Sequence, residues 1–434
     1  MDRVVILGVG FGGLQAARDL AGQGVELVLV NRHNFHLFTP LLYQVATGSQ
    51  EQESIVYPLR DIIRDWPDTK FRLAEVIRVD LEHQLLETDH GPIAYDYLIL
   101  APGSVPSYFG MESIQRWAYP LKDLEDAVQL RNRILRAFER ALDEPDPDVR
   151  RALLTFVIVG GGPTGIEFAG ALAELVRLEL RRDYGELSRE QVRVILLEAS
   201  SRLLGVFPEP LGKYAAARLE RMGVEVRLEA RVTGAEVDKV LLDGSDPIPT
   251  FTLFWSTGVE GQPLGFEPGV ARVHGGRLAV EPDLSLPGHP EVFAVGDLAY
   301  VEQQGVALPQ MAPVAIQEGA HAARAVRARL QGRAVKPFHF RDKGMMAVIG
   351  RGKAVATLFG LNFKGFLAWL VWLGFHLISL IGFRNRVVVL VNWVTDYFLF
   401  ARKLRLITQQ ERSGLAESSL EGRRQLADGS AEVG

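Results

Sequence analysis

The chain contains no cysteine among its 434 residues. This absence excludes redox-active disulfides, thiolate nucleophiles, cysteine-ligated iron–sulfur clusters and structural disulfides. Any oxidation or reduction that the protein carries out must therefore use a bound cofactor.

The sequence also lacks an excess of positive charge and an N-terminal targeting signal. Its formal net charge is −5, which gives no basis for nucleic-acid binding. Met1 leads almost directly into an apolar strand, without the basic and long apolar regions of a signal peptide, so we expect a cytoplasmic location. Hydrophobic residues at 47% and charged residues at 23% describe an ordinary globular chain, whose length predicts two or three domains.

The first organised feature is a short apolar run followed by glycines. Residues 4–7 predict a buried strand, and residues 14–21 predict a helix. Between them, Gly8, Gly10 and Gly13 form a G-x-G-x-x-G pattern, the strand–glycine–helix context of a Rossmann-like dinucleotide-binding unit. The first glycine makes the tight turn, the second lets the backbone approach a pyrophosphate, and the third lets helix and strand pack closely. The helix N-terminus then holds the phosphates.

The second predicted strand, residues 25–30, ends at Asn31. A Rossmann unit usually carries an acid there to bind ribose hydroxyls. An asparagine can still donate to and accept from a hydroxyl, so we interpret Asn31 as a ribose contact. The following residues 33–44 are rich in aromatics and short of charge. They fit a loop that covers the core and a wall against a flat cofactor ring equally well.

The glycine pattern recurs after a linker at residues 144–148. Residues 153–159 predict a strand, and residues 166–180 predict a long helix. Gly160, Gly162 and Gly165 occupy the three glycine positions between them. Two such contexts in one chain indicate two dinucleotide sites.

Two carboxylates accompany the second unit. Glu198 ends the predicted strand 192–197, where a carboxylate accepts from both ribose hydroxyls and repels a 2′-phosphate. It therefore favours NADH over NADPH, with a merely solvated strand-end acid as the alternative. Glu167 lies in the first turn of the nucleotide-binding helix, where the helix dipole favours its ionised form. We interpret it as a carboxylate beside the nicotinamide, with helix capping as the alternative.

The last third of the chain contains two further features. Residues 292–297 predict a strand that ends at Asp297, on the ligand side of an open α/β sheet, and a helix is predicted at 314–330. Residues 366–383 form 18 uncharged, aromatic-rich positions that end at Arg384-Asn385-Arg386, and Arg402, Lys403 and Arg405 lie further on. Apolar helices flanked by basic residues suit an anionic membrane surface, and a buried dimer or core element is the alternative.

These motifs together resemble the two-dinucleotide-binding-domain flavoproteins, and more closely the type II NADH:quinone oxidoreductases. The resemblance is most specific at residues 160–167, 292–297 and 312–319. It implies an α/β fold with two Rossmann-like dinucleotide-binding domains, one for FAD and one for NADH, plus a C-terminal membrane-associating helical segment. The expected divisions are residues 1–112 and 263–340 for the FAD domain, 113–262 for an inserted NADH domain, 341–407 for the membrane-associating region and 408–434 for a disordered tail.

The resemblance also implies three sets of site residues and no metal. The FAD-binding set is Gly8, Gly10, Phe11, Gly12, Gly13, Asn31, Arg32, Gln44, Gly103, Asp297 and Ala315. The NADH-binding set is Gly160, Gly162, Thr164, Gly165, Glu167, Glu198 and Gly258. The quinone-binding set is Ala312, Ile316 and Gln317. Asp297 would contact the flavin ribityl chain, and Glu167 would be the catalytic carboxylate. Asn31 and Pro313 depart from the residues common in the family, an acid and a glutamine.

The implied reaction is hydride transfer from NADH to non-covalently bound FAD, followed by reduction of a respiratory quinone to quinol. No bundle of membrane spans with buried acids or lysines is present to pump protons. The enzyme would be peripheral or monotopic on the cytoplasmic face of the cell membrane, held in one leaflet by residues 366–405, and a homodimer is a further expectation. The absence of cysteine argues against the related disulfide reductases and sulfide:quinone oxidoreductases.

Two other functions remain open from the residues alone. One is an NADH-dependent flavin reductase for a soluble electron carrier such as ferredoxin, which would leave residues 366–400 unexplained. The other is a nicotinamide-binding sensor or scaffold, which would be colourless when purified. The sequence does not distinguish menaquinone from ubiquinone, nor a ternary complex from a ping-pong order.

Overall fold

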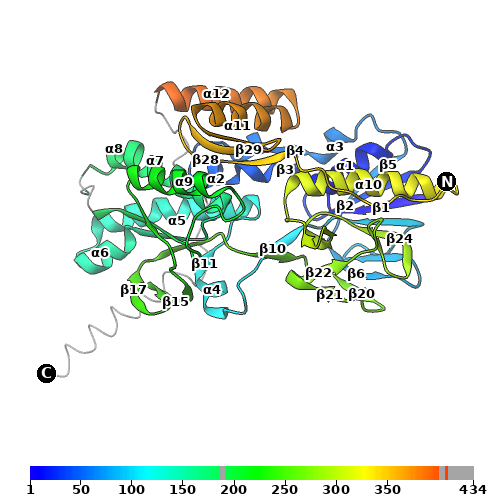
Figure 1. The fold of residues 1–434 in the computed structure, drawn as a ribbon, viewed down its shortest axis with the longest axis horizontal. Helices are drawn as coiled ribbons and strands as arrows, with labels where there is room; N and C mark the ends of the chain where they lie inside the picture. Colours follow the sequence, from blue (N-terminus) through cyan, green and yellow to red (C-terminus); the bar gives the residue numbers. More distant parts are fainter. Residues whose placement is uncertain (186, 188–190, 400–405, 409–434) are drawn as a thin grey trace. The chain divides into compact units, whose positions relative to one another are not determined.

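The computed structural model describes residues 1–185, 187, 191–399 and 406–408 (Figure 1). The chain divides into two compact units. The first unit comprises residues 1–37, 56–107 and 259–342, and the second comprises residues 38–55, 108–258 and 343–434. The predicted basic residues Arg402, Lys403 and Arg405, and all of the predicted tail except Thr408, lie outside the described residues.

A six-stranded sheet in the order β23-β24-β9-β1-β2-β5 forms the centre of the first unit. Its strands are Ser285–Leu286 (β23), His289–Ala294 (β24), Tyr97–Leu100 (β9), Arg3–Leu7 (β1), Glu26–Asn31 (β2) and Thr69–Leu73 (β5). Neighbours pair in parallel except β23 with β24. Because parallel strands are covered on both faces, β1 is an uninterrupted apolar run after Arg3.

Two helices of the first unit, α1 (Phe11–Leu20) and α10 (Ala312–Leu330), run side by side (Figure 1). The other elements that this unit contains are β3 (Phe35–Leu37), β4 (Val56–Pro58), α3 (Leu59–Ile62), β6 (Val76–Asp80), β7 (Leu85–Thr88), β8 (Ile93–Ala94), β10 (Ser104–Pro106), β19 (Val259–Gly261), β20 (Gly265–Glu267), β21 (Arg272–Val273), η5 (His274–Gly276), β22 (Arg277–Ala279), η6 (Gly296–Leu298), β25 (Ala299–Tyr300), β26 (Glu302–Gln303) and β27 (Val306–Ala307). The strands among them form small separate sheets. Val79 of β6 and Leu86 of β7 belong to the same hydrophobic core as the central sheet.

A five-stranded parallel sheet in the order β11-β18-β12-β13-β14 forms the centre of the second unit. Its strands are Ala118–Tyr119 (β11), Thr252–Trp255 (β18), Thr155–Val159 (β12), Arg193–Leu197 (β13) and Val224–Arg227 (β14). The other elements that precede residue 260 in this unit are η1 (Thr39–Leu41), α2 (Leu42–Ala46), η2 (Gln52–Ile55), α4 (Glu112–Trp117), α5 (Leu124–Asp143), α6 (Pro147–Leu153), α7 (Pro163–Leu175), the π-helix η3 (Val176–Leu180), α8 (Arg181–Asp183), α9 (Glu209–Arg221), β15 (Val232–Glu236), β16 (Lys239–Leu242) and β17 (Ser245–Pro249).

The C-terminal part of the second unit is an antiparallel sheet followed by two helices. The strands are β28 (Gly344–Gly350), β29 (Lys353–Leu358) and β30 (Leu361–Gly365), and the helices are α11 (Phe366–Ser379) and α12 (Phe383–Leu399). Figure 1 shows α11 and α12 beside each other, over β29. Within the described residues, no helix combines the length and apolar character needed to cross a membrane.

Several boundaries differ from those predicted. Helices α1 and α7 begin three residues earlier than expected, at Phe11 and Pro163, because proline and glycine are accepted in a first turn whose N–H groups have no helical partner. The break between α11 and α12 lies at residues 380–382, and not at the arginines. Gly382, in this break, has a positive φ of 83°. Arg386 instead donates to the carbonyls of Leu380 (2.8 Å) and Ile378 (2.9 Å), which satisfies the end of α11.

Candidate functional site

The first glycine turn has the geometry of a phosphate cradle. A Cβ placed on Gly8, whose φ is +87°, would lie 2.2 Å from the carbonyl oxygen of Ala101. A Cβ on Gly13 would lie 1.9 Å from the carbonyl oxygen of Gly8. A Cβ on Gly10 would meet nothing within 4 Å. Two glycines are thus required by close backbone packing, and the middle one borders open space at the N-terminus of α1.

Gly12 lies at a close crossing of α1 and α10. A Cβ on Gly319 would lie 2.1 Å from the Gly12 carbonyl oxygen, and a Cβ on Gly12 would lie 3.0 Å from the Ala315 carbonyl oxygen. Ala315 is buried and faces Gly296. These contacts give Gly12 and Ala315 a packing role within the first unit.

Asn31 bridges the end of β2 and the glycine turn. Its Oδ1 accepts from the Val9 N–H at 3.1 Å, and its Nδ2 donates to the His33 carbonyl at 2.7 Å. The buried His36 donates from Nδ1 to the Val9 carbonyl at 2.9 Å, and burial lowers the pKa of His36, which keeps the ring neutral. The ring of Phe11 meets His36 edge-on at 5.5 Å. Part of the aromatic stretch 33–44 therefore holds the turn in place.

Asp297 is held by polar contacts at the carboxyl end of the first unit's sheet. Ser104 Oγ donates to its carboxylate at 2.5 Å, and Gln310 Nε2 donates to its carbonyl at 2.9 Å. The Gly296 N–H donates to Glu318 at 2.5 Å. Burial, with the neighbouring charge of Asp297, raises the pKa of Glu318 to about 8. The strand-end acid is thus fixed in orientation on the ligand side of the sheet.

The second glycine turn repeats the geometry of the first. A Cβ on Gly160, whose φ is +111°, would lie 2.9 Å from Ser256 Oγ, and a Cβ on Gly165 would lie 1.9 Å from the Gly160 carbonyl oxygen. A Cβ on Gly162 would meet nothing within 4 Å. The open position again borders a helix N-terminus, here that of α7, and Thr164 is exposed in its first turn.

Glu198 follows β13 and joins this turn. Its carboxylate accepts from the Gly161 N–H at 2.6 Å and from the Ser200 N–H at 2.7 Å. It therefore occupies in the second unit the position that Asn31 occupies in the first. Two backbone donors fix the orientation of the carboxylate beside the glycine turn.

The remaining predicted residues lie in varied surroundings. Arg32 is exposed after β2, and Gly103 has a φ of +81° with open space around it. Gly258 lies against the ring of Phe109. On α10, Ile316 is 37% exposed and Ala312 is half-buried. Gln317 Nε2 donates to the Arg341 carbonyl, and Gln317 Oε1 accepts from the Arg341 N–H, each at 3.0 Å.

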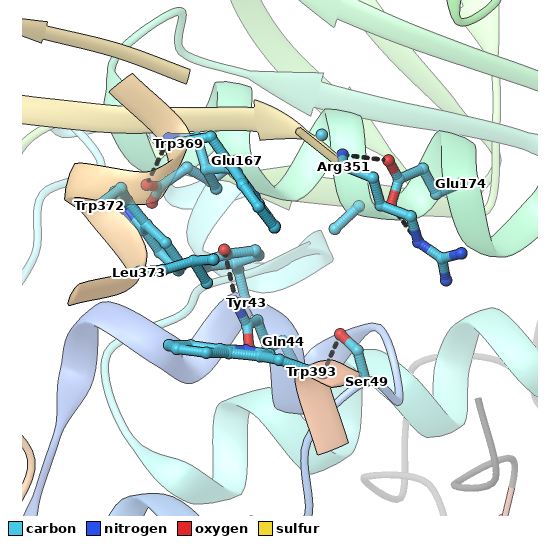
Figure 2. Close-up of a pocket in the computed structure, with 13 residues that line it drawn as sticks. Tyr43, Gln44, Ser49, Glu167, Glu174, Arg351, Trp369, Trp372, Leu373 and Trp393 are labelled. Carbon is cyan, nitrogen blue, oxygen red and sulfur yellow. Dashed lines mark hydrogen bonds and ion pairs between the residues drawn. The ribbon is translucent and has the colours of Figure 1, made fainter. Parts of the chain in front are cut away.

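A cavity within the second unit has no counterpart in the sequence prediction (Figure 2). It comprises about 570 Å³, part of it open to solvent. Its walls come from α2, α7, β28, α11 and α12. The lining residues are Tyr43, Gln44, Ser49, Glu167, Ala171, Glu174, Val348, Gly350, Arg351, Trp369, Trp372, Leu373 and Trp393. Three indoles and a phenol ring make this lining suitable for a flat aromatic ligand.

Two acids line this cavity, Glu167 and Glu174, and Glu167 is the one predicted from the sequence. Strand β28 packs tightly on α7, since a Cβ on Gly170 would lie 1.9 Å from the Ile349 carbonyl oxygen. The Val348 N–H consequently donates to Glu167 Oε1 at 3.2 Å. The carboxyl group opens on the cavity but is enclosed by protein, and this burial raises its pKa to about 8, against the opposing effects of the Val348 N–H and the Trp372 side chain. The expectation of an ionised Glu167 is therefore wrong, because desolvation outweighs the helix dipole.

Gln44, predicted at the flavin, lies in α2 and is 7% exposed. Its Oε1 accepts from Trp393 Nε1 at 2.9 Å, and its Nε2 donates to the Tyr43 hydroxyl at 2.8 Å. The predicted site residues did not include Tyr43 or the tryptophans, although residues 33–44 were interpreted as a core-covering loop or a wall against a flat cofactor ring. Trp369 and Trp372 belong to the aromatic-rich run 366–383, and Trp393 lies beyond it. Their convergence could not be predicted, because it depends on contacts between distant parts of the chain.

Comparison with known proteins adds family information to this geometry. Residues 2–319 match the family model described as pyridine nucleotide-disulphide oxidoreductase, and residues 343–403 match the NDH2 C-terminal domain. The type II NADH:quinone oxidoreductase Ndh of Mycobacterium tuberculosis is 40% identical, over 99% of this chain and 94% of that protein. The related NdhA of the same organism is also 40% identical, over 94% of this chain and 90% of its own length.

Solved structures show the same fold at low sequence identity. The structure of NDH2 from Plasmodium falciparum in complex with NADH matches this chain with a TM-score of 0.86 at 18% identity. The match covers 94% of this chain and 100% of the Plasmodium chain. The sulfide:quinone oxidoreductase of Aquifex aeolicus has a TM-score of 0.70 at 18% identity, over 92% of this chain and 96% of that one.

Proposed function

Since the chain belongs to the family of type II NADH:quinone oxidoreductases, we propose that its two glycine turns hold a non-covalent FAD and NADH, one in each unit. The protein is a flavoprotein that oxidises NADH and reduces a quinone. The observation that carries this assignment is the 40% identity to the mycobacterial enzyme over 99% of the chain. The duplicated turn supports it.

The residues of the first unit fit FAD. The open position at Gly10, at the N-terminus of α1, would accept the pyrophosphate. Asn31 and Arg32 would contact the adenosine ribose, and Asp297 would contact the ribityl chain. The residues assigned to pack around the cofactor are Gly8, Phe11, Gly12, Gly13, Gly103 and Ala315. When bound, FAD would supply the hydride acceptor and the two-electron donor.

The residues of the second unit fit NADH. Its pyrophosphate would lie against Gly162 and Thr164 at the start of α7, with Gly160, Gly165 and Gly258 shaping the site. The carboxylate of Glu198 would accept from both ribose hydroxyls and repel a 2′-phosphate. This arrangement favours NADH as the substrate.

We propose that the quinone ring enters the aromatic cavity of the second unit. Because the pKa of Glu167 is about 8, its carboxyl group is protonated at neutral pH. Oε1 accepts from Val348, so Oε2 would carry the proton. Glu167 could then give this proton to a quinone oxygen as the ring gains electrons. Ala312, Ile316 and Gln317, assigned to the quinone by the family resemblance, do not line this cavity.

The C-terminal helices would attach the enzyme to the cytoplasmic face of the membrane, in one leaflet. Among the side chains of these helices that the structure describes, nine apolar ones are more than 40% exposed: Phe366, Leu367, Leu370, Phe375, Ile378, Val387, Leu390, Val391 and Val394. An apolar surface of this extent on helices suits the lipid interface.

For the chain as a whole, we propose FAD-binding residues 1–112 and 263–340, an NADH-binding region at 113–262 and a membrane-associating region at 341–407. A homodimer remains a proposal.

The test is a pair of half-reactions on the purified yellow protein. Stopped-flow spectroscopy should show bleaching of the flavin by NADH and its return on mixing with a quinone. Menaquinone and ubiquinone analogues should be compared in the second step. A colourless protein, or a reduced flavin that no quinone reoxidises, would contradict the proposal.

A further inference from the structure

Helix α10 carries a buried carboxyl group that reaches the end of the first unit's sheet. The group belongs to Glu318, which is 1% exposed. Its Oε2 accepts from the Gly296 N–H at 2.5 Å. Gly296 has a φ of +71° and begins the short 3-10 helix η6, directly before Asp297. The hydrogen bond therefore fastens the residue that precedes the proposed ribityl contact to α10.

The backbone around this contact is closely packed. A Cβ on Gly296 would lie 3.4 Å from the Cβ of Ala315, three residues before Glu318 on α10. At the next residue, a Cβ on Gly319 would lie 2.1 Å from the Gly12 carbonyl oxygen of α1. Figure 1 shows α1 and α10 side by side. Glu318 thus bonds to the strand-end turn at the place where its helix meets the helix of the phosphate cradle.

The charge state of Glu318 follows from its surroundings. Burial and the negative charge of Asp297 on η6 raise its pKa to about 8, and the accepted hydrogen bond and the positive charge of Arg277 on β22 oppose this shift. The carboxyl group is therefore protonated at neutral pH. Because Oε2 accepts from the backbone, Oε1 would carry the proton.

Three further titratable groups belong to the two helices at this crossing. On α1, Arg18 is exposed and Asp19 is half-buried. On α10, His321 lies one turn after Glu318 and is 7% exposed. Burial lowers the pKa of His321, so its ring is neutral at neutral pH. Ionisation of Glu318 would thus place a second negative charge near Asp297 in a desolvated site.

We propose that Glu318 is a positioning residue of the flavin site, whose neutral carboxyl group holds the turn that carries Asp297, the proposed contact of the ribityl chain. This inference rests on the proposed FAD site. No covalent bond forms or breaks at Glu318, which acts through the backbone of Gly296. FAD carries a negative pyrophosphate, so it binds best while Glu318 is uncharged.

The experiment measures the Kd of FAD for the full-length wild type, Glu318→Gln and Glu318→Leu. Serial dilution of the yellow holoenzyme gives this Kd from the rise in flavin fluorescence at pH 7 and pH 9. Glu318→Gln keeps an oxygen acceptor for Gly296 and cannot ionise, so its Kd should equal that of the wild type at pH 7. At pH 9 the wild-type Kd should be about tenfold higher than that of Glu318→Gln, because only about one wild-type molecule in ten retains the proton.

Glu318→Leu removes the acceptor and leaves the Gly296 N–H unpaired, so it should bind FAD at least about fivefold more weakly at pH 7. Glu302→Gln is the matched control, because Glu302 is an exposed acid of the same unit that accepts from the Tyr300 hydroxyl. This variant should keep the wild-type Kd at both pH values.

If Glu318→Leu does not fold, the comparison of the wild type with Glu318→Gln at the two pH values still decides the question. The same Kd in these two proteins at pH 9, or wild-type affinity for FAD in Glu318→Leu, would overturn the inference alone. A wild-type protein that is colourless and takes up no added FAD would instead overturn the proposed function, and this inference with it.

Discussion

At the scale of single residues, we expect Glu198 to select NADH over NADPH. Its carboxylate already accepts from the N–H groups of Gly161 and Ser200, so its orientation is fixed before NADH binds. A charge-assisted hydrogen bond contributes about 1.5–3 kcal/mol. Glu198→Ser should therefore raise the KM for NADH by at least about tenfold and narrow the preference over NADPH. Glu225→Gln is a control, because that carboxylate is paired with Arg193; an unchanged NADH/NADPH ratio in Glu198→Ser would remove Glu198 from the site.

Glu167 should impose an upper pH limit on quinone reduction. Its pKa of about 8 keeps the carboxyl group protonated at neutral pH, and above that pH the proposed proton donor is lost. The rate of flavin reoxidation by quinone should fall above about pH 8 in the wild type. Glu167→Gln should be slow throughout and lack this limb, while flavin binding is retained. Single-turnover rates of Glu167→Gln equal to those of the wild type at every pH would leave Glu167 with a structural role only.

The same residue should also affect stability. The folded state retains the Glu167 proton up to about pH 8, whereas an unfolded chain releases it near the ordinary glutamate pKa of about 4.3. The folded state thus binds more protons between these values, so the contribution of Glu167 to stability declines as pH rises through this range. The melting temperatures of wild type and Glu167→Gln should be compared at pH 5 and at pH 8. Relative to the wild type, the variant should melt at a higher temperature at pH 8 than at pH 5.

At the scale of elements, the crossing of α1 and α10 should control flavin binding. A Cβ on Gly319 would lie 2.1 Å from the Gly12 carbonyl oxygen, so Gly319→Ala must displace one helix. Such overpacking costs about 1–3 kcal/mol, and the displaced α1 carries the phosphate cradle. We expect loss of flavin, measured by absorbance after gel filtration. Gly374→Ala, where a Cβ on α11 meets nothing within 4 Å, should keep its flavin.

The elements also show why prediction from sequence succeeded where it did. The turns at Gly8 and Gly160 could be predicted because strand, glycines and helix are contiguous, and their chemistry is local. The cavity could not be predicted, because Tyr43 and Trp393 are brought together only by tertiary packing. The protonated state of Glu167 was missed for the same reason: the helix dipole is readable from its position on α7, whereas its burial depends on β28, from a distant part of the chain.

At the scale of the whole molecule, deletion of the C-terminal helices is a poor test of membrane binding. Removal of residues from Phe366 onward would release the proposed lipid contacts, but it would also remove Trp372 and His376. Trp372 is 2% exposed, and His376 stacks on it at 4.2 Å with burial that lowers its pKa to about 4. The deletion should thus give a yellow protein that NADH reduces, with the cavity destroyed and quinone reduction lost. Substitutions confined to the exposed face separate these effects.

Replacement of exposed apolar residues should detach the enzyme while its chemistry persists. Phe375, Ile378 and Leu390 are 52%, 74% and 44% exposed, and each buried apolar side chain contributes roughly 1.5–3 kcal/mol to transfer from water. The triple glutamine variant should move from the membrane pellet to the supernatant and retain both half-reactions with a soluble quinone. Ala368→Ser, at a buried position on α11, is the control and should remain membrane-bound. If the helices lie in one leaflet, as we propose, a tag after Gly434 should be reached by protease only from the cytoplasmic side. Cleavage from the outer face would contradict this topology.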